Sequence, residues 1–191
     1  MAKRTSKSVA RRFAVRTDLV IAGRHIEVAY RVPDLQPRLQ GPWSLEHDKI
    51  AWTDPATGLH CIVRRMRGGN LGAFVAVPRG HAIFGYSAEA IPPGLLRTHG
   101  GVDYAQACDD RGPEDRSICH VHVHSGNVER HDDAWWLGTV CDEIGDLIPD
   151  DVGHATEARR LGIDQVYRDE GYAIDLCTAL AHDLALLGET R

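Results

Sequence analysis

Side chains able to do acid–base chemistry are concentrated between His99 and Asp146. His99 precedes Gly100 and Gly101, whose backbone can approach a ligand closely and whose amide groups could hold an anionic oxygen, although a plain turn would use the same glycines. Glu143 and Asp146 add carboxylates, and a histidine with carboxylates is what hydrolysis by general acid–base catalysis requires. We therefore predict that His99, Glu143 and Asp146 are catalytic and that Gly100 and Gly101 bind the ligand.

Three further groups in this stretch have a chemical and a structural interpretation. Cys141 could act as a nucleophile with His99 as its base, but we favour a buried structural cysteine. Tyr104 and Trp136 are predicted to bind the ligand by stacking on a planar group such as a nucleobase. Aromatic residues beside strands are more often part of the core, so this alternative stays open.

Alternate histidines in 118–124 offer a candidate metal site. On a strand, His120, His122 and His124 share one face, and neighbours two positions apart have Cα atoms about 7 Å apart. His120 and His122 could therefore share one divalent metal ion, with a third ligand from His99, Glu143 or Asp146. The alternative is a polar strand face open to water, so the metal is an optional cofactor.

The elements that must position these groups follow from the apolar patterns. Alternating runs predict a hairpin around Gly23-Arg24, and further short strands follow without intervening helices, which favours an antiparallel arrangement. A helix is predicted from about Asp164 to Leu187, with Asp164 as its N-cap and Gly188 as its stop. The segment after Pro149 is interpreted as irregular. The predicted fold is α+β, an antiparallel β-sheet with one long C-terminal helix packed on it; the strands are predicted at 19–22, 26–30, 50–52, 59–63, 71–77, 118–124 and 135–141.

Length and composition favour one domain, because 191 residues with 43% hydrophobic content can bury a core. Residues 1–16 hold six of the 22 basic side chains and no acid, which leaves 16 basic against 27 acidic side chains, a net charge of −11, in the remainder. We predict a basic N-terminal arm (1–16), solvated and frayed, and a single domain (17–191) whose residues 17–40 form a peripheral hairpin and linker. Nucleic acid would be contacted only through the arm, if at all, because an acidic body repels phosphates.

The cysteines and the hydropathy bear on the compartment. Five cysteines without a C-x-x-C pair indicate reduced thiols rather than a disulfide framework. The chain lacks an apolar run of about 18 residues and an apolar leader after its first basic residues. We expect a cytoplasmic protein that does not bind membranes.

An ordered series of motifs resembles a family of uncharacterised small proteins of bacteriophages and actinobacterial genomes, over roughly residues 48–187. The family pattern is G-Y-V-x-V-P-x-G-H, H-G-G-[LI]-T-Y, I-C-H-V, W-W-[FI]-G-F-D-C-A-H-x-G-D and Y-R-D. Its counterparts here lie at 73–81, 99–104, 118–121, 135–146 and 167–169. This chain departs from it at Val140, where the family has Asp, and at Glu143, where the family has His. The resemblance implies a phage-type accessory protein and supplies no reaction.

The leading functional hypothesis is a small hydrolase acting on a phosphate-bearing or nucleotide-like ligand. The first alternative is a non-catalytic binder that sequesters a signalling nucleotide or inhibits a host protein, an anti-defence role that the departures at Val140 and Glu143 would suit. A structural or virion protein is a third alternative, favoured only by the basic arm.

Overall fold

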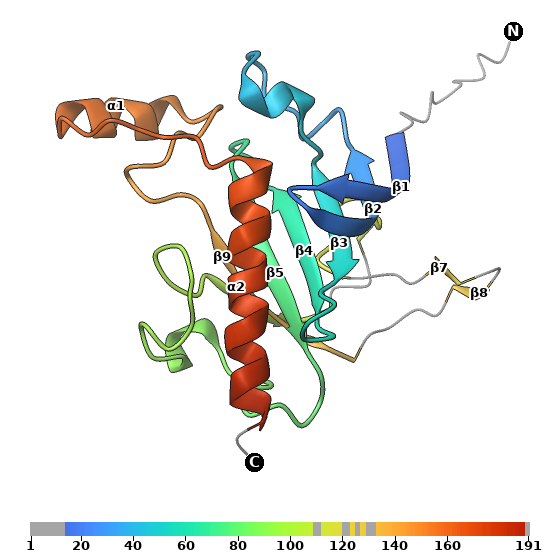
Figure 1. The fold of residues 1–191 in the computed structure, drawn as a ribbon. Helices are drawn as coiled ribbons and strands as arrows, with labels where there is room; N and C mark the ends of the chain where they lie inside the picture. The colour runs from blue at the N-terminus through green and yellow to red at the C-terminus, as the bar shows by residue number, and fades with distance from the viewer. Residues whose placement is uncertain (1–13, 109–111, 120–122, 125–126, 129–132, 190–191) are drawn as a thin grey trace, which may run out of the picture.

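The protein is an α+β fold in which a long C-terminal helix covers one face of a seven-stranded antiparallel sheet (Figure 1). The computed structural model describes residues 14–108, 112–119, 123–124, 127–128 and 133–189. The sheet order is β1-β2-β3-β4-β5-β9-β6, so β9 lies between β5 and β6. The strands of this sheet are β1 (Ala14–Ile21), β2 (Arg24–Arg31), β3 (Lys49–Thr53), β4 (His60–Arg65), β5 (Leu71–Val77), β6 (Tyr104–Ala107) and β9 (Trp135–Val140).

The remaining elements are short except for the last helix. The strands β7 (Val123–His124) and β8 (Asn127–Val128) form a separate pair, and two 3-10 turns, η1 (Pro42–Leu45) and η2 (Ala88–Ala90), interrupt loops. The helices are α1 (Val152–Arg160) and α2 (Glu170–Glu189). Among the described residues, neither helix is both long and apolar enough to cross a bilayer.

The predicted hairpin is confirmed as β1 and β2 and belongs to the main sheet, because β2 pairs with β3 from Val28 opposite Ala51 onward. Strand β1 already begins at Ala14, so the last residues of the predicted arm are part of the sheet; residues 1–13 lie outside the described residues. The tip of the hairpin reaches α2, where a Cβ added at Gly171 would lie 3.9 Å from Ala22.

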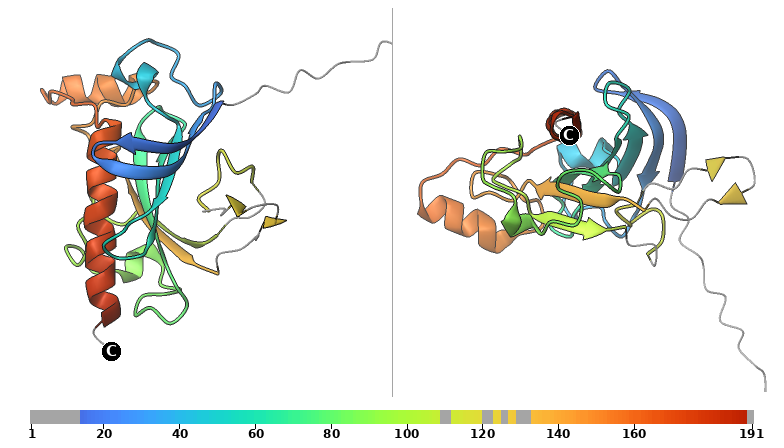
Figure 2. Two further views of the ribbon diagram at one scale, coloured as in Figure 1. Left: turned by 45° about the vertical axis from the view of Figure 1, so that its right-hand side comes forward. Right: turned by 90° about the horizontal axis from the view of Figure 1, so that it is seen from below.

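Strand β5 is buried along its whole length because both faces of the sheet are covered. Its residues Leu71, Ala73 and Val75 face α2, whose buried side chains fill that side; Phe74 and Ala76 face the opposite side, here called the second face. Figure 2 shows the helix on one side of the sheet, seen nearly edge-on. Each large aliphatic side chain buried in this way contributes about 1.5–3 kcal/mol. The α2 side chains of this core are Ala173, Ile174, Cys177, Leu180, Ala181 and Leu184.

Helix α2 (Glu170–Glu189) has its N-cap five residues later than predicted. Asp169, not Asp164, caps it, since the Asp169 carboxylate accepts a hydrogen bond from the Tyr172 amide (2.8 Å). The preceding segment is extended and bridges to the turn at Asp146, with the Val166 amide donating to the Gly145 carbonyl at 2.9 Å. Gly188 lies within the helix and does not end it. The predicted N-cap was wrong because the extended segment is held by tertiary contacts that helical periodicity does not reveal.

Helix α1 lies in the segment after Pro149, which was predicted to be irregular, so that prediction was wrong. The helix begins after Asp151, whose carboxylate accepts a hydrogen bond from the His154 amide at 2.9 Å. Ala158 is the buried residue of this helix, so the sequence carries no apolar stripe that would indicate it.

The second face is covered by residues 112–119, here called the strap. Ile118 and Cys119 were predicted to belong to a strand but lie in a bend, with Ile118 packed into the core of the second face. A disulfide joins Cys108 to Cys119, which corrects the prediction that all five cysteines are reduced; Cys61, Cys141 and Cys177 are free and buried. This bond could not be predicted from the spacing of the cysteines, because the pairing depends on how the strap folds back onto the end of β6.

Arg65 lies in a polar cluster beside the start of α2, in which the Arg65 and Asp48 side chains are fully buried and Tyr167 is partly exposed. Its Nε donates to Asp48 (2.8 Å) and its Nη2 to Glu46 (3.0 Å), while Nη1 donates to the Tyr167 hydroxyl (3.0 Å). The other Glu46 oxygen accepts the Glu170 amide at 3.0 Å. The cluster therefore ties strands β3 and β4 to the first residue of α2.

Replacing Arg65 by Ala should destabilise the fold strongly. The carboxylates of Asp48 and Glu46 would stay buried without their cation, so we expect the free energy of unfolding to fall by about 3–5 kcal/mol in urea denaturation. Arg67→Ala, at an exposed position two residues away, is the control and should change it by about 0.5 kcal/mol or less. Equal effects of the two substitutions would contradict the proposed role of the cluster.

The disulfide can be tested by mass spectrometry and by mutation. Alkylation in denaturant without a reductant should label three cysteines, against five after reduction. Replacing Cys108 and Cys119 together by Ser should lower the free energy of unfolding by about 2–4 kcal/mol, because a cross-link restricts the unfolded chain. Five labelled thiols in the unreduced protein would show that the bond is absent.

Candidate functional site

His99 lies in the loop that follows Arg97, close to the start of α2. Three other segments contact it, namely the end of β9, the turn at Glu143–Asp146 and the first turn of α2. The His99 Nε2 lies 2.5 Å from the Asp146 carboxylate, and its Nδ1 lies 2.7 Å from the Tyr172 hydroxyl. Because the carboxylate can only accept, we assign the Nε2–H tautomer, in which Nδ1 accepts the Tyr172 proton. The result is a continuous line of hydrogen bonds, Asp146–His99–Tyr172.

Thr139 fixes the backbone of His99. Its hydroxyl donates to the His99 carbonyl (2.7 Å) and lies 3.1 Å from the His99 amide, which donates to it. Thr139 is fully buried on β9 and faces α2, the same side as Leu137. The histidine is thus held by its main chain as well as by both ring nitrogens.

Asp146 is a buried carboxylate whose side chain is 1% exposed. One oxygen accepts from the Arg168 Nε (2.8 Å); the other accepts from the Glu143 amide (2.9 Å) and from His99. The Asp146 carbonyl in turn accepts from Gln165 at 2.8 Å. Charge-assisted hydrogen bonds of this kind offset the cost of taking the carboxylate out of water.

Arg168 places a cation beside the tyrosine. Its guanidinium lies 4.9 Å from the centre of the Tyr172 ring, and its side chain is 32% exposed. Its hydrogen bond to Asp146 is the main cause that raises the pKa of Arg168. Within the described part of the chain its Nη groups have no hydrogen bond, so they can donate to an anion.

Two groups near His99 have pKa values raised by their surroundings. Burial raises the pKa of the Tyr172 hydroxyl, and the neighbouring Cys141 and Asp146 add to this. Burial likewise raises the pKa of the Cys141 thiol to about 12. A thiol of that pKa carries no thiolate at neutral pH, which supports a structural cysteine rather than a nucleophile.

The predicted glycine turn lies beside Glu143. Gly100 has a φ of +81°, and a Cβ added there would lie 1.8 Å from the Glu143 carboxylate. The carboxylate therefore occupies the space next to the turn, where it would repel an anionic oxygen. A cavity of about 290 Å³ is lined in part by Thr98, Gly100 and Gly101; the His99 side chain instead points to Asp146 and Tyr172.

Tyr104 and Trp136 do not join His99. Both belong to the second face, where Trp136 is fully buried and Tyr104 packs edge-on against Phe74. The position of Trp136 leaves no ring face open to a ligand, which corrects its predicted role. Strand alternation separates Trp136 from Thr139, since residues of opposite parity on β9 face opposite sides of the sheet. Tyr104 on β6 pairs with Gly138, which has the same parity as Trp136, and so lies on the second face as well.

The candidate metal ligands His120 and His122 lie outside the described residues. In the part of the chain that is described, no group of three or more His, Cys, Asp or Glu side chains is placed to hold a metal ion. Tyr172, Arg168 and Thr139 were missed as site residues. The Y-R-D motif contains Arg168 and could have indicated it, whereas Tyr172 and Thr139 carry no signal beyond their place in a helix and a strand.

Comparisons of the chain with protein-family models, with curated proteins and with solved structures found no match.

The buried thiol gives a measurable pH dependence. A cysteine whose pKa is raised from 9.0 to about 12 on folding stabilises the protein fully below pH 9 and loses that contribution as the pH rises toward 12. Between those values the free energy of unfolding should fall more steeply in the wild type than in Cys141→Ala, by up to about 1.4 kcal/mol per pH unit. Identical slopes in urea denaturation, or alkylation of Cys141 in the native protein at pH 7, would contradict this.

Proposed function

We propose that this protein is a small acid–base enzyme, a hydrolase of a phosphate-bearing or nucleotide-like ligand. The observation that carries the proposal is the Asp146–His99–Tyr172 line, with hydrogen bonds of 2.5 and 2.7 Å. It differs from the arrangement predicted from sequence, because Tyr172 rather than His99 would meet the ligand.

In this proposal Tyr172 relays a proton. Water attacks the phosphorus of the ligand and gives its proton to the Tyr172 oxygen as the Tyr172 proton moves to Nδ1 of His99. The bond from phosphorus to the leaving group breaks, the leaving group departs with the bonding electrons, and the proton on His99 returns to it through Tyr172. The raised pKa of Tyr172 disfavours a standing phenolate, so the two transfers would be concerted. The buried Asp146 carboxylate would stabilise the imidazolium that forms.

Arg168 supports the choice of an anionic ligand. Its Nε donates a hydrogen bond to Asp146 at 2.8 Å, which fixes the orientation of the guanidinium and leaves the two Nη groups to contact a ligand. A guanidinium positioned in this way suits phosphate oxygens, which it can contact through two parallel hydrogen bonds. Glu143 would not bind the anion, because its own carboxylate lies against the Gly100 turn.

One observation favours the alternative of a non-catalytic binder. Both ring nitrogens of His99 are already bonded within the protein, and every oxygen of the Asp146 carboxylate has a partner. A network in which the His99 nitrogens and the Asp146 oxygens already have partners can hold Arg168 rigidly for ligand binding without transferring a proton. A phage-type protein that sequesters a signalling nucleotide would require only such a binding site and no catalytic group.

Tyr172→Phe separates the two functions because it removes only the hydroxyl. We expect the wild type to hydrolyse at least one of p-nitrophenyl phosphate, bis(p-nitrophenyl) phosphate or the common nucleoside triphosphates, and the variant to lose about 10²–10⁴-fold in kcat with little change in KM. Tyr86→Phe, at an exposed tyrosine, is the matched control and should keep full activity.

Calorimetry with the same compounds completes this test. Binding of a nucleotide that is abolished in Arg168→Gln, with no turnover by the wild type, would exclude the enzyme and favour the binder. If neither turnover nor binding is detected, both proposals for this site fail.

A further inference from the structure

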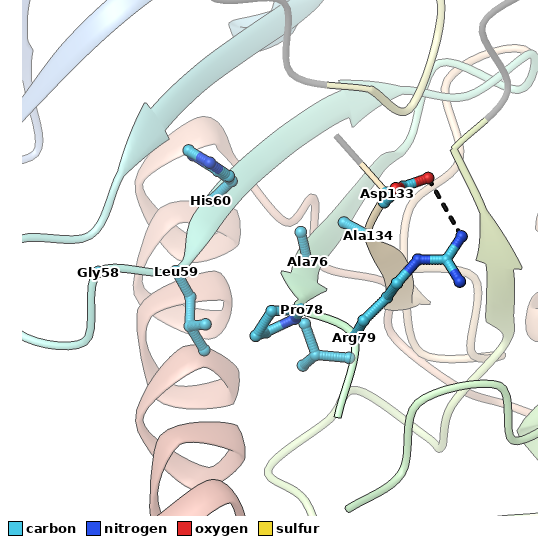
Figure 3. A pocket seen from close by; sticks show the side chains of 9 residues that line it. Gly58, Leu59, His60, Ala76, Pro78, Arg79, Asp133 and Ala134 are labelled. Atoms are coloured by element: carbon cyan, nitrogen blue, oxygen red, sulfur yellow. Dashed lines mark hydrogen bonds and ion pairs between the residues drawn. The ribbon is translucent and has the colours of Figure 1, made fainter. Parts of the chain in front are cut away.

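A second cavity lies on the second face of the sheet, at the end of β9 opposite to the His99 site. It has a volume of about 410 Å³. Figure 3 shows that its lining side chains come from the start of β4, the end of β5 and the residues before β9. They are Gly58, Leu59, His60, Ala76, Val77, Pro78, Arg79, Asp133 and Ala134.

Small side chains create this cavity. Ala76 on β5 and Ala134 before β9 belong to the packed core of the second face. Their side chains are too short to fill the space beside them, and this space is the cavity. The lining is therefore mainly apolar, and the volume lies at the lower end of the range of roughly 300–1,000 Å³ typical of small-molecule sites. A ligand of one or two fused rings fits this size.

The polar groups of the cavity lie at its sides. The Arg79 Nη2 lies 3.2 Å from the Asp133 carboxylate, and both side chains are more than two-thirds exposed. Across the cavity, the Nδ1 of His60 lies 3.2 Å from the Thr53 hydroxyl, which fixes the ring. An ion pair so exposed is weak, so a ligand can insert between its partners.

The ion pair determines what kind of ligand would fit. Arg79 presents donors directly beside the acceptors of Asp133, and together the two carry no net charge. A neutral molecule with an acceptor next to a donor on one edge satisfies both groups, whereas an anion would have to compete with Asp133 on an acidic protein. A ligand without polar groups would leave the pair unused.

We infer that this cavity binds a small, uncharged heteroaromatic molecule of the nucleobase class. Its ring would lie on Ala76 and Ala134, and its edge would accept from Arg79 and donate to Asp133. This inference is independent of the proposed function, because the cavity and His99 lie on opposite faces and at opposite ends of β9.

The test uses the full chain and adenine as the probe, followed by amide resonances in two-dimensional NMR. Adenine should shift the amides of Ala76, Arg79 and Ala134 in a saturable manner. Arg79→Met keeps the aliphatic stem and removes the guanidinium, and it should weaken binding at least tenfold. Ala134→Leu fills the cavity and should abolish binding; Arg159→Met, at an exposed arginine on α1, is the matched control and should bind like the wild type.

Arg79 is exposed, so the Arg79→Met variant keeps the test valid even if Ala134→Leu fails to fold. Three results would overturn the inference. They are the absence of adenine-induced shifts at these amides, equal affinity of the wild type and Arg79→Met for adenine, and binding of toluene or inorganic phosphate at the same amides as strongly as adenine.

Discussion

The burial of one carboxylate, that of Asp146, constrains the architecture around the candidate site. A buried charge costs several kcal/mol unless it is paired and hydrogen-bonded. Its partners come from separate segments, namely Arg168 before α2, His99 after a long loop and the Glu143 amide in its own turn. Satisfying Asp146 therefore fixes three segments at once. For this reason the structural stability of the region and the geometry of His99 cannot be varied independently.

A second cluster of buried charges holds the first residue of the same helix. Arg65 binds Asp48 and Glu46, and Glu46 also accepts the first amide of α2. Hydrogen bonds between charged groups are directional, whereas the apolar contacts along the rest of α2 are not. The two clusters thus define where the helix begins and how it is rotated, and the apolar core then supplies most of the burial. This division explains why α2 starts at Glu170 rather than at the first residue of its apolar pattern.

Strand β9 serves both faces of the sheet. Thr139 faces α2 and clamps the His99 backbone, while Trp136 packs in the core of the second face near Ala134. The alternation of side chains separates an ionic network at one end of the strand from an apolar cavity at the other. The His99 network and the apolar cavity therefore lie on opposite faces of β9, with the sheet between them.

The α+β class, the hairpin, most strands of the main sheet and the long helix could be predicted from the amino-acid sequence, because alternation and helical periodicity are local properties. The sequence also predicted, from their residue types, that His99 and Asp146 would converge on one site, although 47 positions separate them in the chain. Three features became apparent from the folded chain alone: Tyr172, Thr139 and Arg168 complete the network, Tyr104 and Trp136 face away from it, and Cys108 is bonded to Cys119. These outcomes depend on strand parity, on the order in which β9 inserts beside β5, and on charge compensation between segments far apart in the chain. No local pattern encodes such pairings, because their free energy arises only when the partners are buried together.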